Sequence, residues 1–149
     1  MAVIALVYGT VYGAAEQLAE VVSEHLQGAG HQVRLEGEAS LDKVLEPRPD
    51  ALLVITSTTG QGDIPDNLLP FYLELKDSFP LLNGLPFGVI SLGDSSYGDT
   101  FCGAGRQFDE LLAELGGGAL APRLDIDACE TLEPEGPALS WLDTLLEKL

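Results

Sequence analysis

The stretch YGTVYGAAEQLAE, residues 8 to 20, joins a strand pattern to a helix pattern through a glycine turn. The residues before it, AVIALVY at 2 to 8, form a near-continuous apolar run, as a strand buried on both faces does. After the turn, apolar residues recur at the three- and four-residue spacing of a helix: Ala15, Leu18, Ala19, Val22 and Leu26. A buried strand followed directly by an amphipathic helix indicates a parallel α/β fold.

Four further strands are predicted from their apolar patterns. The runs at 50 to 57 and 85 to 93 are near-continuous and typical of central strands. The stretches at 31 to 36 and 119 to 126 alternate instead, which indicates edge strands. The second of these contains Pro122, which cannot donate a ladder hydrogen bond.

Helices are predicted between and after these strands. Helical spacing recurs in two sets of apolar residues, namely Phe108, Leu111, Leu112 and Leu115, and Leu139, Leu142, Leu146 and Leu149. A shorter helix is expected to begin near Asp66 or Asn67, with Pro70 in its first turn. We expect residues 37 to 49 to be a connection with room for one helical turn, and LGGG at 115 to 118 to end a helix.

Strands that alternate with helices imply right-handed crossovers and a parallel sheet. Placing the second and fifth strands at the edges predicts a three-layer α/β/α fold whose five strands follow the order 2-1-3-4-5. At 149 residues the chain is expected to be one domain, residues 1–149. In that order the crossovers reverse direction between the first and third strands, so a ligand crevice is expected at their carboxyl ends.

The composition excludes several classes of partner. The formal net charge is -17, and the seven Lys and Arg residues are scattered, so neither nucleic acid nor a membrane surface is an expected ligand. No apolar run is long enough for a membrane span, and no secretion signal follows Met1, so we expect a cytoplasmic protein. We also expect a monomer. Cys102 and Cys129 lack the spacing of a metal site and fit reduced thiols.

Three loops converge on the predicted crevice, and none contains a Lys or Arg. They are residues 8 to 15, TSTTGQGDIPDN at 56 to 67 and GDSSYGDTFCGA at 93 to 104. A glycine turn that opens a helix can hold a phosphate through backbone N–H groups and the helix dipole, without a basic side chain. The GxxxxGK[ST] and GxGxxG patterns are absent, which disfavours ATP or NAD bound through either.

The three loops resemble the FMN-binding loops of the flavodoxin family. The resemblance is greatest to the small single-domain, short-chain flavodoxins of the MioC and YqcA type, and extends to the flavodoxin domains of diflavin reductases. It covers essentially the whole chain, without the loop that long-chain members insert in the last strand. It implies a flavodoxin-like fold, FMN as cofactor, and a low-potential one-electron carrier between a reductase and acceptor proteins, with no catalytic or metal-binding residue of its own.

The resemblance also implies where FMN would bind. It places the phosphate on the turn from Thr10 to Ala15 and the flavin ring between the second and third loops, with Tyr97 stacked on one face. The implied cofactor-binding residues are Thr10, Val11, Tyr12, Gly13, Ala14, Ala15, Thr58, Thr59, Gly60, Gln61, Gly93, Asp94, Tyr97, Phe101, Cys102 and Gly103. From the residues alone, Tyr97 fits an anchor of its own turn equally well, and Phe101 fits a core anchor better than a ring contact.

Two departures from the family pattern bear on the cofactor. Tyr12, Ala14 and Ala15 occupy positions where flavodoxins commonly place small hydroxyl or amide groups, so weaker FMN binding is expected. Thr59 stands where diflavin reductases place an aromatic residue, so one face of the ring is expected to be less covered.

Two other functions stay open at this point. One is an FMN-dependent quinone reductase, and the other is an interaction module that has lost the flavin. A strongly acidic surface most commonly maintains solubility, and it would also attract basic redox partners, such as a ferredoxin/flavodoxin-NADP reductase, and an electron acceptor.

Overall fold

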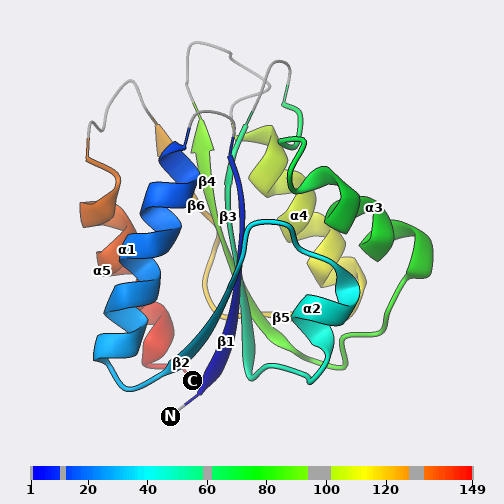
Figure 1. The fold of residues 1–149 in the computed structure, drawn as a ribbon, viewed down its shortest axis with the longest axis horizontal. Helices are drawn as coiled ribbons and strands as arrows, with labels where there is room; N and C mark the ends of the chain where they lie inside the picture. The colour runs from blue at the N-terminus through cyan, green and yellow to red at the C-terminus, as the bar shows by residue number, and fades with distance from the viewer. Residues whose placement is uncertain (1, 11–12, 59–61, 94–101, 128–132, 149) are drawn as a thin grey trace.

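The computed structural model describes residues 2–10, 13–58, 62–93, 102–127 and 133–148 (Figure 1). Strands and helices alternate along the chain, as the sequence predicts. In order they are β1 Val3–Gly9, α1 Ala14–Gly28, β2 Gln32–Glu36, α2 Leu41–Leu45, β3 Ala51–Ser57, α3 Leu69–Ser78, β4 Pro86–Gly93, α4 Gly103–Glu114, β5 Gly118–Ala119, β6 Leu124–Asp127 and α5 Glu135–Leu146.

One parallel sheet runs through the molecule in the order β2-β1-β3-β4-β5, which confirms the predicted order. The expected fifth strand at 119 to 126 is divided into two pieces, β5 and β6, and both pair with β4. Pro122 lies between the pieces and has no N–H to donate to the ladder. The division at this residue therefore has a direct chemical cause.

Helices cover both faces of the sheet, giving the predicted three layers (Figure 1). Alternate residues of β1 point to opposite faces: Ala5 and Val7 pack in the cluster formed with α2, α3 and α4, whereas Ile4 and Leu6 pack in the cluster formed with α1 and α5. All four side chains are fully buried. A strand buried on both faces must be apolar at every position, which explains the continuous apolar runs.

The start of α3 differs from the sequence prediction. The helix is expected to begin near Asp66 or Asn67, with one of them as its cap. It begins at Leu69 instead; Leu68 occupies the cap position, and no side chain caps the helix. Pro70 does lie in the first turn, as expected. The Asn67 amide forms its hydrogen bonds with other segments, described below.

The apolar stripe of α5 is also shifted from the expected one. The buried residues are Ala138, Leu142 and Leu145, whereas Leu139 and Leu146 are only partly buried. The helical spacing of three and four is present. Leucines also flank the buried stripe, so the sequence does not show which of them face the core. Leu149 lies outside the described residues.

Two smaller expectations are confirmed. The connection after β2 contains one short helix, α2, and Gly116 follows the end of α4 in a left-handed conformation with φ 94°. Among the described residues, no helix is both long enough and apolar enough to cross a bilayer.

Candidate cofactor site

The candidate site lies at the carboxyl ends of three neighbouring strands, where β1 ends at Gly9, β3 at Ser57 and β4 at Gly93. The chain leaves β1 through α1 on one face of the sheet and leaves β3 through α3 on the other. The two connections run in opposite directions along the sheet, to β2 and to β4. Open α/β sheets bind ligands at such a point.

The first loop leads directly into α1. Gly13 adopts φ 93° and occupies the position before the first helical residue, Ala14. The hydroxyl oxygen of Thr10 accepts a hydrogen bond from the Gly13 N–H at 2.8 Å. Ala15 is buried in the core, so its side chain is not available to a ligand. The N–H groups of a first helical turn have no carbonyl partner within the helix, which makes this turn suited to an anion.

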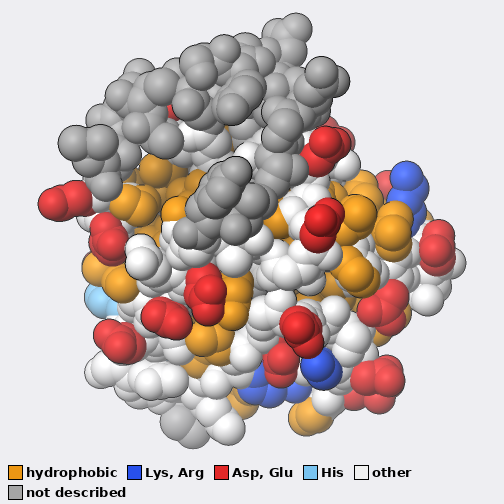
Figure 2. Space-filling model, turned by 45° about the horizontal axis from the view of Figure 1, so that its top comes forward, with side chains coloured by type: hydrophobic (Ala, Val, Ile, Leu, Met, Phe, Trp, Pro, Cys, Tyr) orange, Lys and Arg blue, Asp and Glu red, His pale blue; other side chains and the backbone are white. Residues whose placement is uncertain are grey.

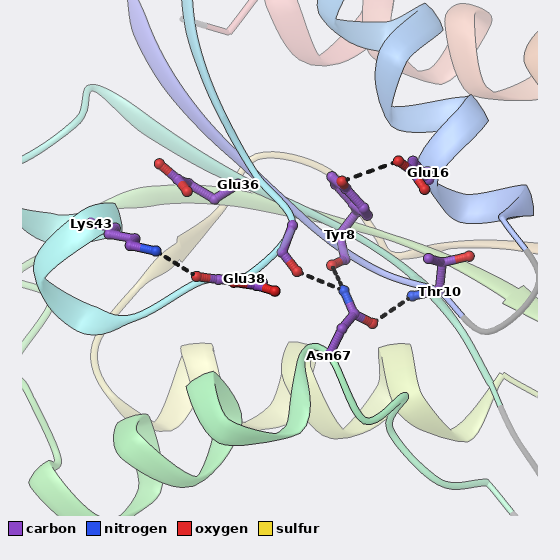
Figure 3. A pocket seen from close by; sticks show the side chains of 8 residues that line it. Tyr8, Thr10, Glu16, Glu36, Glu38, Lys43 and Asn67 are labelled. Atoms are coloured by element: carbon purple, nitrogen blue, oxygen red, sulfur yellow. Dashed lines mark hydrogen bonds between the residues drawn. The ribbon is translucent and has the colours of Figure 1, made fainter.

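An open cleft of about 510 Å³ lies beside the first loop (Figure 3). Its lining includes the carboxylates of Glu16, Glu36 and Glu38. The Lys43 ammonium donates to the backbone carbonyl of Glu38 at 3.3 Å. Three carboxylates make this cleft unfavourable for phosphate, so an anion is favoured only at the helix turn itself.

Tyr8 stands between this cleft and α1. Its hydroxyl donates to the Glu16 carboxylate at 3.5 Å. Burial of the ring, together with the charge of Glu16, raises the pKa of the Tyr8 phenol above its ordinary value. The phenol therefore stays protonated near neutral pH and acts as a donor.

Asn67 forms three hydrogen bonds with one amide group and joins the end of β1 to the segment after β2, as Figure 3 shows. Its Nδ2 donates to the carbonyl oxygens of Tyr8 at 3.0 Å and Gly37 at 2.8 Å. Its Oδ1 accepts from the Thr10 N–H at 2.9 Å. From sequence, Asn67 is expected only as a possible helix cap, since Asn is common at that position.

The second loop contacts the first turn of α4. The Thr58 hydroxyl oxygen accepts from the Ala104 N–H at 3.4 Å. Further along the second loop, at Gly62, the backbone carbonyl accepts from Gln107 Nε2 at 2.8 Å. The same Nε2 donates to the carbonyl of Gly103 at 3.3 Å. Nothing in the sequence pattern singled out Gln107, because a Gln in an amphipathic helix is usually a solvent-facing residue.

The third loop rejoins the described chain at Cys102, which is buried and adopts φ 54° before α4. Its thiol donates to the carbonyl of Ser91 at 3.4 Å, and the Ser91 hydroxyl donates to the carbonyl of Cys102 at 3.3 Å. Ser91 also accepts from the Gly105 N–H at 3.2 Å. Burial raises the pKa of the Cys102 thiol to about 11. The sulfur atom is thus directed to β4 and supports the start of α4.

The positive charge of Arg123 lowers the pKa of the Cys102 thiol and so opposes part of the effect of burial. Nearby carboxylates balance the charge of Arg123. Its guanidinium donates to the Asp125 carboxylate at 2.8 Å and to the Asp109 carboxylate at 3.4 Å. The hydrogen bond with Asp125 raises the pKa of Arg123 above its ordinary value. Two acidic partners leave no net positive charge at this point.

Half of the predicted cofactor residues belong to the described chain, and they gather as expected at the carboxyl ends of β1, β3 and β4. These are Thr10, Gly13, Ala14, Ala15, Thr58, Gly93, Cys102 and Gly103. The other half lie outside the described residues, namely Val11, Tyr12, Thr59, Gly60, Gln61, Asp94, Tyr97 and Phe101. For all sixteen residues, contact with the cofactor stays a prediction.

Comparison with known proteins decides the family. The family model described as Flavodoxin matches residues 6–141. The chain belongs to the flavodoxin family. FMN is accordingly its cofactor, and electron transport is the process that its family serves.

Individual relatives agree over nearly the whole length of this flavodoxin. Flavodoxin YqcA of Pectobacterium carotovorum subsp. carotovorum is 43% identical over 143 residues, which cover 96% of this chain and 94% of that protein. Protein MioC of Escherichia coli (strain K12) is 38% identical over 149 residues, covering 100% and 99%. The solved structure of a mutant flavodoxin from Pseudomonas aeruginosa has a TM-score of 0.92 at 47% identity, covering 99% and 98%. The resemblance to the MioC and YqcA proteins is confirmed.

The described residues fit the phosphate of FMN. Gly13 gives the turn its left-handed conformation, and the first turn of α1 presents its N–H groups beside the Thr10 hydroxyl. The first-loop residues that the structure describes include no Lys or Arg, so the donors that they offer an anion are backbone N–H groups and the Thr10 hydroxyl. Among the described residues, no cluster of His, Cys, Asp and Glu has the arrangement of a metal site.

Proposed function

We propose that this flavodoxin is a low-potential one-electron carrier that operates between a reductase and acceptor proteins in the cytoplasm. Bound FMN supplies the redox chemistry, and the chain binds it, orients it and selects the partners. The proposal assigns no catalytic residue to the protein. One observation carries it: a glycine turn that opens α1 without a basic side chain, placed at the switch point of the sheet.

The phosphate is proposed to bind from Thr10 to Ala15. There Thr10 offers its hydroxyl proton, because the hydroxyl oxygen already accepts from Gly13. The N–H groups of the first helical turn and the helix dipole supply the remaining attraction. The shortage of side-chain hydroxyls after Thr10 supports the expectation that FMN binds more weakly here than in typical members.

The flavin ring is proposed to lie between the second and third loops. The start of α4 supports both, because Ala104 and Gln107 hydrogen-bond to Thr58 and Gly62, while Cys102 bonds to Ser91 at the end of β4. These contacts hold the bases of the two loops at a fixed separation. Fixed loop bases favour binding of a planar ring, since ordering the loops at binding would cost free energy.

The acidic surface supports the proposed choice of partners. Flavodoxins exchange electrons with redox partner proteins, and a net charge of -17 would attract a basic one. Figure 2 shows Asp and Glu side chains spread over the face that comes forward, with few Lys or Arg among them. We propose a ferredoxin/flavodoxin-NADP reductase as the donor class.

Two measurements test this function. Titration of the purified apoprotein with FMN should quench flavin fluorescence with one FMN per chain, whereas FAD should bind much more weakly. The loaded protein should then pass electrons from a flavodoxin reductase to cytochrome c, and should oxidise NADPH negligibly without the reductase. Rapid NADPH oxidation coupled to quinone reduction by the protein alone would instead establish a quinone reductase, and absence of FMN binding would leave an interaction module.

A further inference from the structure

The Asn67 amide extends the hydrogen bonding of β1 beyond the end of β2. Parallel pairing between these strands ends at Val7 and Glu36. The Asn67 amide then bonds the Tyr8 carbonyl and the Thr10 N–H, which are two residues apart and face the same side of the chain. A primary amide carries a carbonyl and N–H groups as a peptide does, so it can replace the missing strand neighbour.

The same amide also fixes the segment that turns away from β1. Its second Nδ2 proton goes to the carbonyl of Gly37, the first residue after β2. Three of the four hydrogen bonds that an Asn amide can form are thereby used, with partners 30 to 59 residues away in sequence. Asn67 is partly buried, and at Gly9 the chain packs so closely that an added Cβ would lie 2.9 Å from the Leu68 side chain. This segment has little freedom to shift.

The hydrogen bonds continue from Asn67 to the start of α1. Asn67 holds the Thr10 N–H, and the Thr10 hydroxyl oxygen accepts from Gly13, which opens the helix. The position of the Thr10 backbone therefore sets where its hydroxyl meets the turn. Asn67 already donates its Nδ2 protons to the carbonyls of Tyr8 and Gly37, so its amide has no N–H left for a phosphate oxygen (Figure 3).

We propose that Asn67 is a positioning residue for the phosphate-binding turn, acting through Thr10. This inference rests on the proposed FMN site. It assigns to Asn67 a selective effect on the phosphate end of the ligand, because the loops proposed to hold the ring are supported by different residues, above all Gln107. Riboflavin is FMN without the phosphate, so comparing the two ligands separates an effect on phosphate binding from an effect on ring binding.

The test compares dissociation constants for FMN and riboflavin, measured by fluorescence quenching with the full-length apoprotein. Asn67→Ala should weaken FMN binding about tenfold while weakening riboflavin binding much less, so that the preference for FMN over riboflavin falls. Gln107→Ala is the matched control: it removes a bridging amide of the ring loops and should leave the preference unchanged. Asn67→Gln keeps the amide but displaces it by one methylene group, so it should also lower the preference for FMN. It provides the test if Asn67→Ala does not fold.

Each result is decisive. A preference that falls in the Asn67 variants but not in Gln107→Ala supports the positioning role. Equal loss of FMN and riboflavin affinity, or no loss, overturns it while leaving the FMN function intact. If the wild-type protein binds no FMN, the proposed function fails first and the inference fails with it.

Discussion

Gly62 and Gly103 meet so closely that a Cβ added to Gly103 would lie 2.8 Å from the Cα of Gly62 and 3.0 Å from its carbonyl oxygen. The second loop therefore rests directly on the backbone of the first turn of α4. Gln107 donates to that same Gly62 carbonyl, so van der Waals contact and a hydrogen bond act at one place. The spacing between the second and third loops depends on the absence of a side chain at Gly103.

Gly103→Ala should consequently destabilise the protein. The methyl group would have to displace the backbone of Gly62, and overpacking of this kind costs about 1 to 3 kcal/mol. Urea unfolding of the apoprotein measures this cost. Gly136→Ala is the matched control, because nothing lies within 4 Å of its added Cβ, and it should leave the free energy of unfolding unchanged or slightly higher. Equal effects of the two variants would contradict the contact.

Cys102 predicts a loss of stability at alkaline pH. Burial raises its thiol pKa to about 11 from the ordinary 9.0, so the folded protein favours the neutral thiol. As the pH rises past about 9, the unfolded chain loses this proton first, which favours unfolding. The contribution is fully present below that pH and is lost as the pH rises to about 11.

Comparison of wild type with Cys102→Ala isolates this titration, because Tyr and Lys groups are common to both proteins. The stability of wild type relative to the variant should fall by about 2 kcal/mol between the two pKa values. Free energies of unfolding from urea titrations across this range provide the measurement. A difference that is constant with pH would mean that the thiol titrates normally.

Much of the fold could be predicted because its determinants are local or periodic. The apolar run at 2 to 8 and the glycine turn after it predict a buried strand, a turn and α1 from neighbouring residues alone. Even the division of the last strand has a visible sign in Pro122. The convergence of the three loops follows from strand order, which the alternation of strands and helices determines.

The supporting hydrogen bonds could not be predicted in the same way. Asn67 bonds Tyr8, Thr10 and Gly37, and Gln107 bonds the second loop from α4. Each partner is distant in sequence, and the choice of partner depends on the packed tertiary structure. From sequence alone, an Asn before a helix is best interpreted as a cap, which is why its role here was missed.

Tyr97 lies outside the described residues, and its stacking on the flavin stays a prediction from sequence. If the ring stacks, Tyr97→Ala should weaken FMN binding by about 1 to 3 kcal/mol through lost apolar contact and lost stacking. Tyr97→Phe should retain most of the affinity, because it keeps the aromatic ring. Fluorescence titration measures both variants, and unchanged affinity in Tyr97→Ala would return Tyr97 to the role of a turn anchor.

The last prediction concerns salt and the docking of a basic partner. Electron transfer from a basic reductase should slow as ionic strength rises, because screening weakens attraction to the acidic protein. Glu38 is exposed beside the first loop, whereas Glu147 is exposed directly after α5, and the C-terminus that follows lies near the opposite end of the strands (Figure 1). If the partner docks over the carboxyl ends, Glu38→Gln should slow transfer about threefold at low salt and reduce its salt dependence, while Glu147→Gln should have a smaller effect.

Stopped-flow reduction of the FMN-loaded variants over a series of salt concentrations provides the rates. Equal effects of the two substitutions would indicate attraction by overall charge alone, and a rate independent of salt would mean that the acidity serves solubility.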